Sequence, residues 1–281
     1  MSAAPARGQT KSGTAAGAAE TASAAVAPVR NAARRVVSLV PPVESDGPRI
    51  RLGIAYGLAA AVLTIVGGGA LAMGAAAVGA TAATQTARSW GALRPVRYLA
   101  FAGGALIPVA AMGGRLGIAA GVVATLVGAL VLAGPGGGSL PVVARVAVIP
   151  IACGLATAAP VALRSDGLAG VAVLLACVLL YDATVFVMGA DAKWRWEGIV
   201  PGLVGIVAVM LFAAAVLVPP FRGGAPWVFG VLALITLPAG AVVGSVLRGP
   251  EPRPVPALRR IDSLLVFAPA WLLLSPLLLG G

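Results

Sequence analysis

The carboxylates in the second half of the chain are its strongest candidates for chemistry. The sequence has only nine Asp and Glu residues, and four of them, Asp182, Asp191, Glu197 and Asp262, follow residue 180 in or beside apolar segments. Asp182 interrupts the apolar run from Val171 to Met188. An ionisable side chain inside such a run is costly to bury in a membrane and is commonly functional. A hydrogen bond to a neighbouring helix, or a protonated and inert carboxyl group, is the structural alternative.

Glu197 and Asp262 stand where apolar helices are expected to begin. Glu197 follows two tryptophans, so it could serve a site or could lie at the membrane interface among aromatic anchors. Asp262 precedes the last apolar run, and an acidic residue in a first helical turn is also favoured by helix electrostatics alone. The chain has no histidine, and Cys153 and Cys177 each lie within an apolar run. This composition argues strongly against a thiolate or imidazole zinc site.

Three short sequence elements follow one another in a recognisable order in the second half of the chain. The stretch YDATVFVMG contains Asp182–Gly189, the segment Trp196–Gly198 reads Trp-Glu-Gly, and residues 259–265 read RRIDSLL at the start of the final helix. A fainter match is Arg88–Trp90. In order and spacing these elements resemble the CDP-diacylglycerol synthases, also called phosphatidate cytidylyltransferases. The resemblance covers roughly residues 50–280 and is strongest in the closing element.

The resemblance implies an activity and roles for individual residues. Members of this family transfer a cytidylyl group from CTP to phosphatidic acid at the cytoplasmic side of the membrane, releasing pyrophosphate. For this chain that implies Asp182 and Asp262 as Mg²⁺ ligands, with Glu197 completing the catalytic set. The basic residues implied to contact phosphate are Lys193, Arg195 and Arg260. The implied partners are membrane lipids, with phosphatidic acid and CTP as substrates, and such a reaction depends mainly on positioning and electrostatic stabilisation.

The sequence departs from the family pattern at positions that matter for metal binding. Arg259 stands where the first Asp of the closing element is expected, and a Pro-rich segment at 249–256 replaces the preceding His-Gly-Gly. A cation at a ligand position repels Mg²⁺. Three interpretations stay open: an active cytidylyltransferase-like enzyme, a catalytically inactive relative that binds anionic lipid or nucleotide headgroups, and a transporter. The transporter interpretation lacks a convincing internal repeat.

The composition indicates that a membrane positions these residues. Hydrophobic residues make up 59% of the chain and charged residues only 10%, which is too apolar for a soluble domain of this length. Many stretches are long enough to cross a hydrocarbon core about 30 Å thick. We therefore predict an all-α polytopic membrane protein, with about nine transmembrane helices and a cytidylyltransferase-like fold. The predicted spans are 52–66, 70–87, 97–113, 116–133, 141–162, 167–190, 198–218, 226–247 and 262–279.

The first division between spans is ambiguous. Gly67, Gly68 and Gly69 could reverse the chain between two helices or could soften one long helix.

Charged residues away from the candidate site are expected to be structural. Asp166 and Glu251 are predicted to be solvated loop residues, and Arg145, inside a span, is expected to snorkel or to find a partner.

The distribution of positive charge predicts the orientation. If the N-terminus is cytoplasmic, sixteen of the 20 Lys and Arg residues fall in cytoplasmic segments, as the positive-inside rule requires. This predicts a multi-pass inner-membrane protein. Residues 1–50 are expected to form a disordered basic cytoplasmic tail, 51–164 the N-terminal transmembrane helices, and 165–281 the membrane region carrying the site.

The net charge of +11 does not point to nucleic acid. No basic face interleaved with aromatic residues accompanies it. Small-residue spacings such as Gly121 to Gly128 permit close helix packing, but they do not distinguish packing within one chain from packing between two. A homodimer is therefore left open.

Overall fold

The computed structural model describes residues 48–134, 140–189, 196–248 and 254–279. These segments are almost entirely α-helical and contain no β-strand, which confirms the all-α prediction. The predicted tail lies outside the described residues except for its last three positions. Lys193 and Arg195, two of the predicted phosphate contacts, also lie outside them, as do Asp191 and Glu251.

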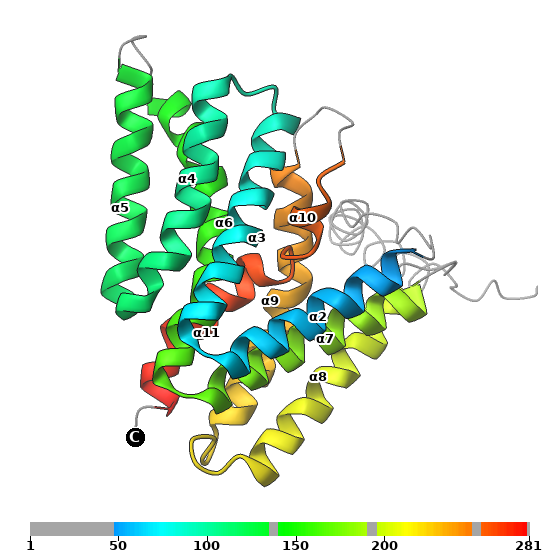
Figure 1. The fold of residues 1–281 in the computed structure, drawn as a ribbon. Coiled ribbons are helices and arrows are strands. Elements are labelled where there is room, and N and C mark those ends of the chain that lie inside the picture. Colours follow the sequence, from blue (N-terminus) through cyan, green and yellow to red (C-terminus); the bar gives the residue numbers. More distant parts are fainter. Residues whose placement is uncertain (1–47, 135–139, 190–195, 249–253, 280–281) are drawn as a thin grey trace, which may run out of the picture. The chain divides into compact units, whose positions relative to one another are not determined.

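Nine long helices occur in the described part of the chain (Figure 1). They are α2 (Pro48–Val66), α3 (Gly68–Ser89), α4 (Arg94–Ala110), α5 (Gly114–Ala133), α6 (Leu140–Asp166), α7 (Leu168–Gly189), α8 (Trp196–Val216), α9 (Ala225–Leu247) and α11 (Leu264–Leu279). A 3₁₀ turn, η1 (Ala111–Gly113), joins α4 to α5, and a short helix, α10 (Pro256–Arg259), precedes α11. The long helices begin and end within about four residues of the ends of the predicted spans. The agreement arises because the same apolar runs, bounded by glycine or proline, determine both the predicted and the observed ends.

Five of these helical segments are long and apolar enough to cross a membrane by length and composition. They are Arg94–Ala133, Val146–Asp166, Leu168–Gly189, Glu197–Val216 and Ala225–Leu247. The segments Gly53–Val66 and Leu264–Leu279 are apolar but shorter. The chain therefore has the character of a multi-pass membrane protein, whereas crossing by all nine helices stays a prediction.

The structure separates the first two helices. Gly67 has a φ of 139°, which ends α2 at Val66 and starts α3 at Gly68. A side chain at Gly74 would collide with Leu63. In a continuous helix these two positions would lie about 16 Å apart, so the chain reverses at Gly67.

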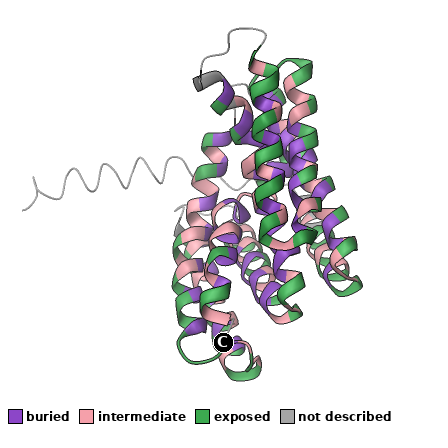
Figure 2. Ribbon diagram, turned by 90° about the vertical axis from the view of Figure 1, so that its left-hand side faces the viewer, coloured by how far each residue is buried: buried purple, intermediate pink, exposed green. Residues whose placement is uncertain are grey.

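Helix α6 lies at the centre of the helical unit. It packs against α3, α4, α5, α7 and α11, and buried residues follow the inward faces of the helices while the outward faces are exposed (Figure 2). Large apolar side chains such as Leu116 and Leu277 are 85% and 79% exposed. Apolar surface of this kind suits contact with lipid rather than with water.

A cluster of aromatic side chains fixes α11 against α9. The indole of Trp271 is fully buried and stacks on Phe229 with ring centroids 4.1 Å apart. Phe267 and Phe221 meet the same indole edge-on, at 5.3 and 6.4 Å. Aromatic pairs in these arrangements add to the stabilisation from burial. The cluster thereby holds the middle of α11 against α9.

Close packing of α3 against α4 depends on Gly79 and Gly104. A methyl group at Gly79 would lie 2.7 Å from Thr157 Oγ1 and would press on the Gly104 carbonyl. We expect Gly79→Ala to lower the free energy of unfolding by about 1 to 3 kcal/mol, because backbone atoms must move. The measurement is reversible denaturation of the purified protein in detergent. Gly68→Ala is the control, since it has nothing within 4 Å; equal stability of the two variants would contradict the prediction.

Candidate functional site

The structure brings Asp182 to the turn that precedes α11. Asp182 lies on α7, and the Ser263 hydroxyl donates a hydrogen bond to its Oδ2 at 3.0 Å. The adjacent Asp262 accepts the Ser263 backbone N–H on its Oδ1 at 2.9 Å and interacts electrostatically with Asp182. Two carboxylates that are eighty residues apart in the chain thus share one serine and one small region.

Helix α9 shapes this turn by leaving room for it. Gly240 and Gly244 lie one helical turn apart on the same face. A methyl group at Gly244 would lie 2.7 Å from Asp262 Cβ, and one at Gly240 would press on the Asp262 and Ser263 carbonyls. Asp262 therefore lies in a turn against α9, whereas the sequence predicts it in the first turn of the last helix. That helix begins at Leu264, because the chain must first pass over the two glycines.

Arg248, directly after α9, has an unsatisfied donor beside this turn. Its Nε donates to the Gly244 carbonyl at 3.3 Å, but its Nη2 is buried and has no hydrogen-bond partner among the described residues. Burial, and secondarily the nearby Arg259, lowers the pKa of Arg248, while Asp262 opposes the shift. A guanidinium nevertheless keeps its charge. A buried cationic donor without a partner suits an anionic ligand.

Arg260, predicted to contact phosphate, lies on the other side of the turn. Its guanidinium carbon lies 5.9 Å from the centroid of the Tyr56 ring on α2. Its Nη1 would be only 3.1 Å from a methyl group at Gly53. Arg260 also acts electrostatically on Asp182. The neighbouring Arg259 is exposed, so positive charge accompanies the two carboxylates from α10 as well as from the end of α9.

Glu197 is not brought to the carboxylate pair by any described contact. It lies in the first turn of α8 and is exposed. The next residue, Gly198, packs against the end of α7. A methyl group added at Gly198 would lie 2.8 Å from the Val185 carbonyl oxygen. The end of α7 at Gly189 is seven residues, or about 10 Å, beyond Asp182. The supporting role predicted for Glu197 stays a prediction.

Three side chains in this region carry oxygen atoms of the kind that bind a hard divalent cation. Asp182 and Asp262 offer carboxylate oxygens and Ser263 offers a hydroxyl. Mg²⁺ is commonly held by one or two protein carboxylates, with phosphate oxygens and waters completing its shell. Within the described residues, no cluster of three or more acidic, cysteine or histidine side chains occurs. The Mg²⁺ site that the family resemblance implies therefore stays a prediction.

Helix α3 anchors the site through residues to which the sequence alone assigned little weight. Trp90 Nε1 donates to the Leu247 carbonyl at 2.7 Å, and the Ala257 N–H donates to Gln85 Oε1 at 3.0 Å. These bonds tie the end of α9 and the start of α10 to α3. The sequence signal for the close approach is the Gly240-x-x-x-Gly244 spacing, which is typical of tightly packed membrane helices. Neither Arg248 nor Gln85 carries any comparable signal.

Comparisons with known proteins add no relative. No protein-family model matches the chain, and neither curated proteins nor solved structures give a match. The resemblance to the CDP-diacylglycerol synthases rests on its three short elements.

Proposed function

We propose that this protein is a membrane-embedded nucleotidyltransferase of the phosphatidate cytidylyltransferase type. It would convert CTP and phosphatidic acid into CDP-diacylglycerol and pyrophosphate. The observation that carries the proposal is the hydrogen bond between Ser263 and Asp182. Through it, the first and the last of the three elements that resemble the family lie in one place, although they are far apart in sequence.

The carboxylates and the serine form the metal-binding half of the proposed site. Asp182 and Asp262 would hold Mg²⁺, and Ser263 orients Asp182 by donating to Oδ2. When bound, Mg²⁺ neutralises phosphate charge and positions the nucleotide phosphates. In the reaction, a phosphate oxygen of phosphatidic acid attacks the α-phosphorus of CTP, and the bond from that phosphorus to the bridging oxygen breaks. Pyrophosphate leaves with the bonding electron pair.

The arginines form the phosphate-binding half. Arg248 would donate from its unpartnered Nη2 to a phosphate oxygen, and this bond would be charge-assisted. Arg260, which lies over Tyr56, contributes positive charge next to Asp182. Developing charge on transferring phosphates is stabilised by such fixed cations. The predicted orientation places this end of the helices at the cytoplasmic side, where CTP is available.

A second function is supported by the small number of acidic groups. No third metal-binding side chain joins the pair within the described part of the chain, and Arg259 lies close enough to affect Arg248 electrostatically. A relative that binds an anionic lipid or nucleotide headgroup without catalysis requires only the arginines. This candidate predicts phosphatidic acid binding without turnover.

Purified full-length protein in lipid nanodiscs tests the proposal. We expect conversion of radiolabelled CTP and phosphatidic acid to CDP-diacylglycerol that stops when EDTA removes Mg²⁺. Arg248→Gln should lower kcat/KM by about tenfold or more, because a charge-assisted phosphate contact is lost. Arg222→Gln, which changes an exposed arginine in the loop between α8 and α9, should leave the rate unchanged.

Two results would count against catalysis. A folded preparation without turnover that still binds phosphatidic acid through Arg248 would support the binding protein. If Arg248→Gln and Arg222→Gln had equal effects, Arg248 would have no special role in contacting phosphate.

A further inference from the structure

A second polar site lies at the opposite end of the helices. The junction of α6 and α7 borders a cavity of about 640 Å³. Along α7, Leu168 at this junction lies fourteen residues, or about 21 Å, from Asp182. Most of the thickness of a bilayer core therefore separates this cavity from the proposed nucleotidyltransferase site.

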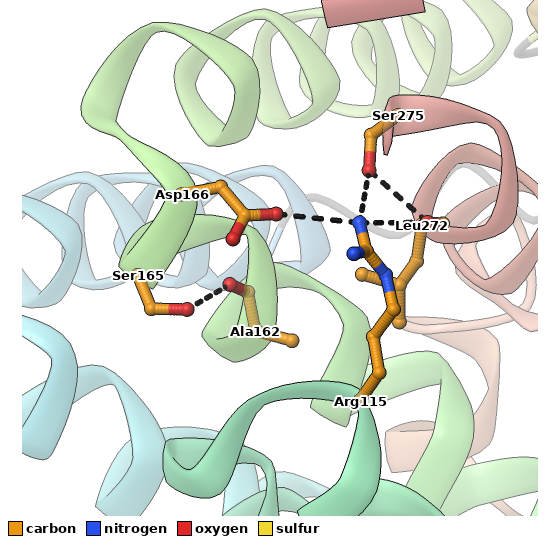
Figure 3. Close-up of polar contacts among 6 residues, drawn as sticks. All are labelled: Arg115, Ala162, Ser165, Asp166, Leu272 and Ser275. Carbon is orange, nitrogen blue, oxygen red and sulfur yellow. Dashed lines mark hydrogen bonds and ion pairs between the residues drawn. The ribbon is translucent and has the colours of Figure 1, made fainter. Parts of the chain in front are cut away.

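The polar lining of the cavity comes from three different helices (Figure 3). Arg115 of α5 donates from Nη2 to Ser275 Oγ of α11 at 2.9 Å, and the same nitrogen lies 3.4 Å from the Leu272 carbonyl. It also lies 3.4 Å from Oδ2 of Asp166, the last residue of α6. The sequence predicts Asp166 to be a solvated loop residue, but the structure places it at a helix end as the partner of Arg115.

This ion pair is long and partly exposed. The separation of 3.4 Å exceeds the 2.7 to 2.9 Å typical of a charge-assisted hydrogen bond. The two side chains are 44% and 54% exposed. Every contact recorded for Arg115 within the described residues uses Nη2, so Nε and Nη1 offer further donors. One anion and one cation could therefore bind here side by side without breaking the bond to Ser275.

The rest of the lining is apolar. Leu163, Pro219, Pro220, Pro276 and Leu279 contribute to the same cavity. Its volume falls within the range of ordinary ligand sites, and it adjoins helices with the apolar character of membrane spans. A cation and a carboxylate beside an apolar wall at the end of such helices match the interfacial part of a phospholipid that carries both charges.

We propose that this cavity binds a zwitterionic phosphate ester with a primary ammonium group, the headgroup chemistry of phosphatidylethanolamine. Arg115 and Ser275 contact its phosphate, and Asp166 accepts a hydrogen bond from its ammonium. The apolar residues contact the glycerol and the first acyl carbons. This site is independent of the proposed nucleotidyl transfer, because no residue is shared and the two sites lie at opposite helix ends.

The test is lipid retention by the full-length protein in detergent, measured by native mass spectrometry. Equal amounts of phosphatidylethanolamine and phosphatidylglycerol serve as probes. We expect the wild type to retain the ethanolamine lipid about tenfold more than the glycerol lipid. Asp166→Asn should abolish that preference, and Arg115→Gln should reduce retention of both lipids about tenfold. Arg222→Gln removes an arginine that does not line the cavity and should behave as the wild type.

A competition experiment separates the two sources of this headgroup. Displacement by glycerophosphoethanolamine would show that the headgroup suffices, and retention against it would show that the apolar wall holds the lipid chains. Arg115→Lys keeps the charge and should retain more lipid than Arg115→Gln, which separates binding from a folding defect. Equal retention of both lipids by the wild type, or an unchanged preference in Asp166→Asn, would overturn the proposal.

Discussion

Asp182→Asn is expected to lower Mg²⁺-dependent formation of CDP-diacylglycerol by about 100-fold or more. The substitution keeps the size of the side chain, and the amide oxygen can still accept the hydrogen bond from Ser263. It removes the negative charge that would hold a divalent cation. Loss of one well-placed electrostatic contact commonly costs an enzyme a factor of this order. The measurement is the initial rate with radiolabelled CTP in nanodiscs, over a range of Mg²⁺ concentrations.

Thr184→Val is the matched control for this variant. Thr184 lies on the same helix, and among the described residues its hydroxyl bonds only to the Leu180 and Tyr181 carbonyls of that helix. Its loss removes a polar group without touching the turn before α11. We expect a rate within about twofold of the wild type. An Asp182→Asn protein as active as Thr184→Val would remove Asp182 from the mechanism.

Gly240→Ala is expected to damage the site without changing any of its polar groups. The added methyl group would press on the Asp262 carbonyl and would lie 3.0 Å from the Ser263 carbonyl. The turn must then move away from α9 and carry both residues with it. We expect about a tenfold loss of kcat/KM, since a displacement of about 1 Å can cost more than this. The free energy of unfolding should fall by about 1 to 3 kcal/mol.

Gly230→Ala controls for the general cost of a methyl group on α9. A methyl group there meets the Met210 side chain at 3.2 Å, and the flexible methionine can yield. The two variants are compared by enzymatic rate and by reversible denaturation. If Gly230→Ala reduced the rate as much as Gly240→Ala, the contact of Gly240 with the turn would not be what positions the site.

The two proposed sites use charged residues in different ways. Near Asp182, an excess of arginine meets two carboxylates, which suits a metal-bound polyphosphate or a phosphate monoester. Near Arg115, one cation meets one carboxylate at 3.4 Å, which suits a zwitterion of no net charge. If both proposals hold, the chain would bind phospholipid headgroups at the two ends of the helices, with each end selecting a different charge.

The sequence by itself determined the helices and the environment that they require. Apolar runs of twenty or so residues form helices because the backbone groups must pair within the segment when water is absent. The glycines at 67–69 left two outcomes open from the sequence, a reversal or one softened helix, and the φ of 139° at Gly67 decided between them. The position of Asp182 within an apolar run was also visible from sequence, since it depends only on neighbouring residues.

The tertiary structure alone decided which of these residues meet. The contact of Asp182 with Ser263 and that of Arg115 with Asp166 each join different helices, so no local periodicity specifies them. The burial of Arg248 Nη2 without a hydrogen-bond partner among the described residues likewise depends on how the segments around it pack. Such contacts depend on how the surfaces of the helices fit together. At Gly240, the absence of a side chain lets the turn at Asp262 and Ser263 lie close to α9. The sequence shows where a glycine is, but packing in three dimensions determines which segment lies against it.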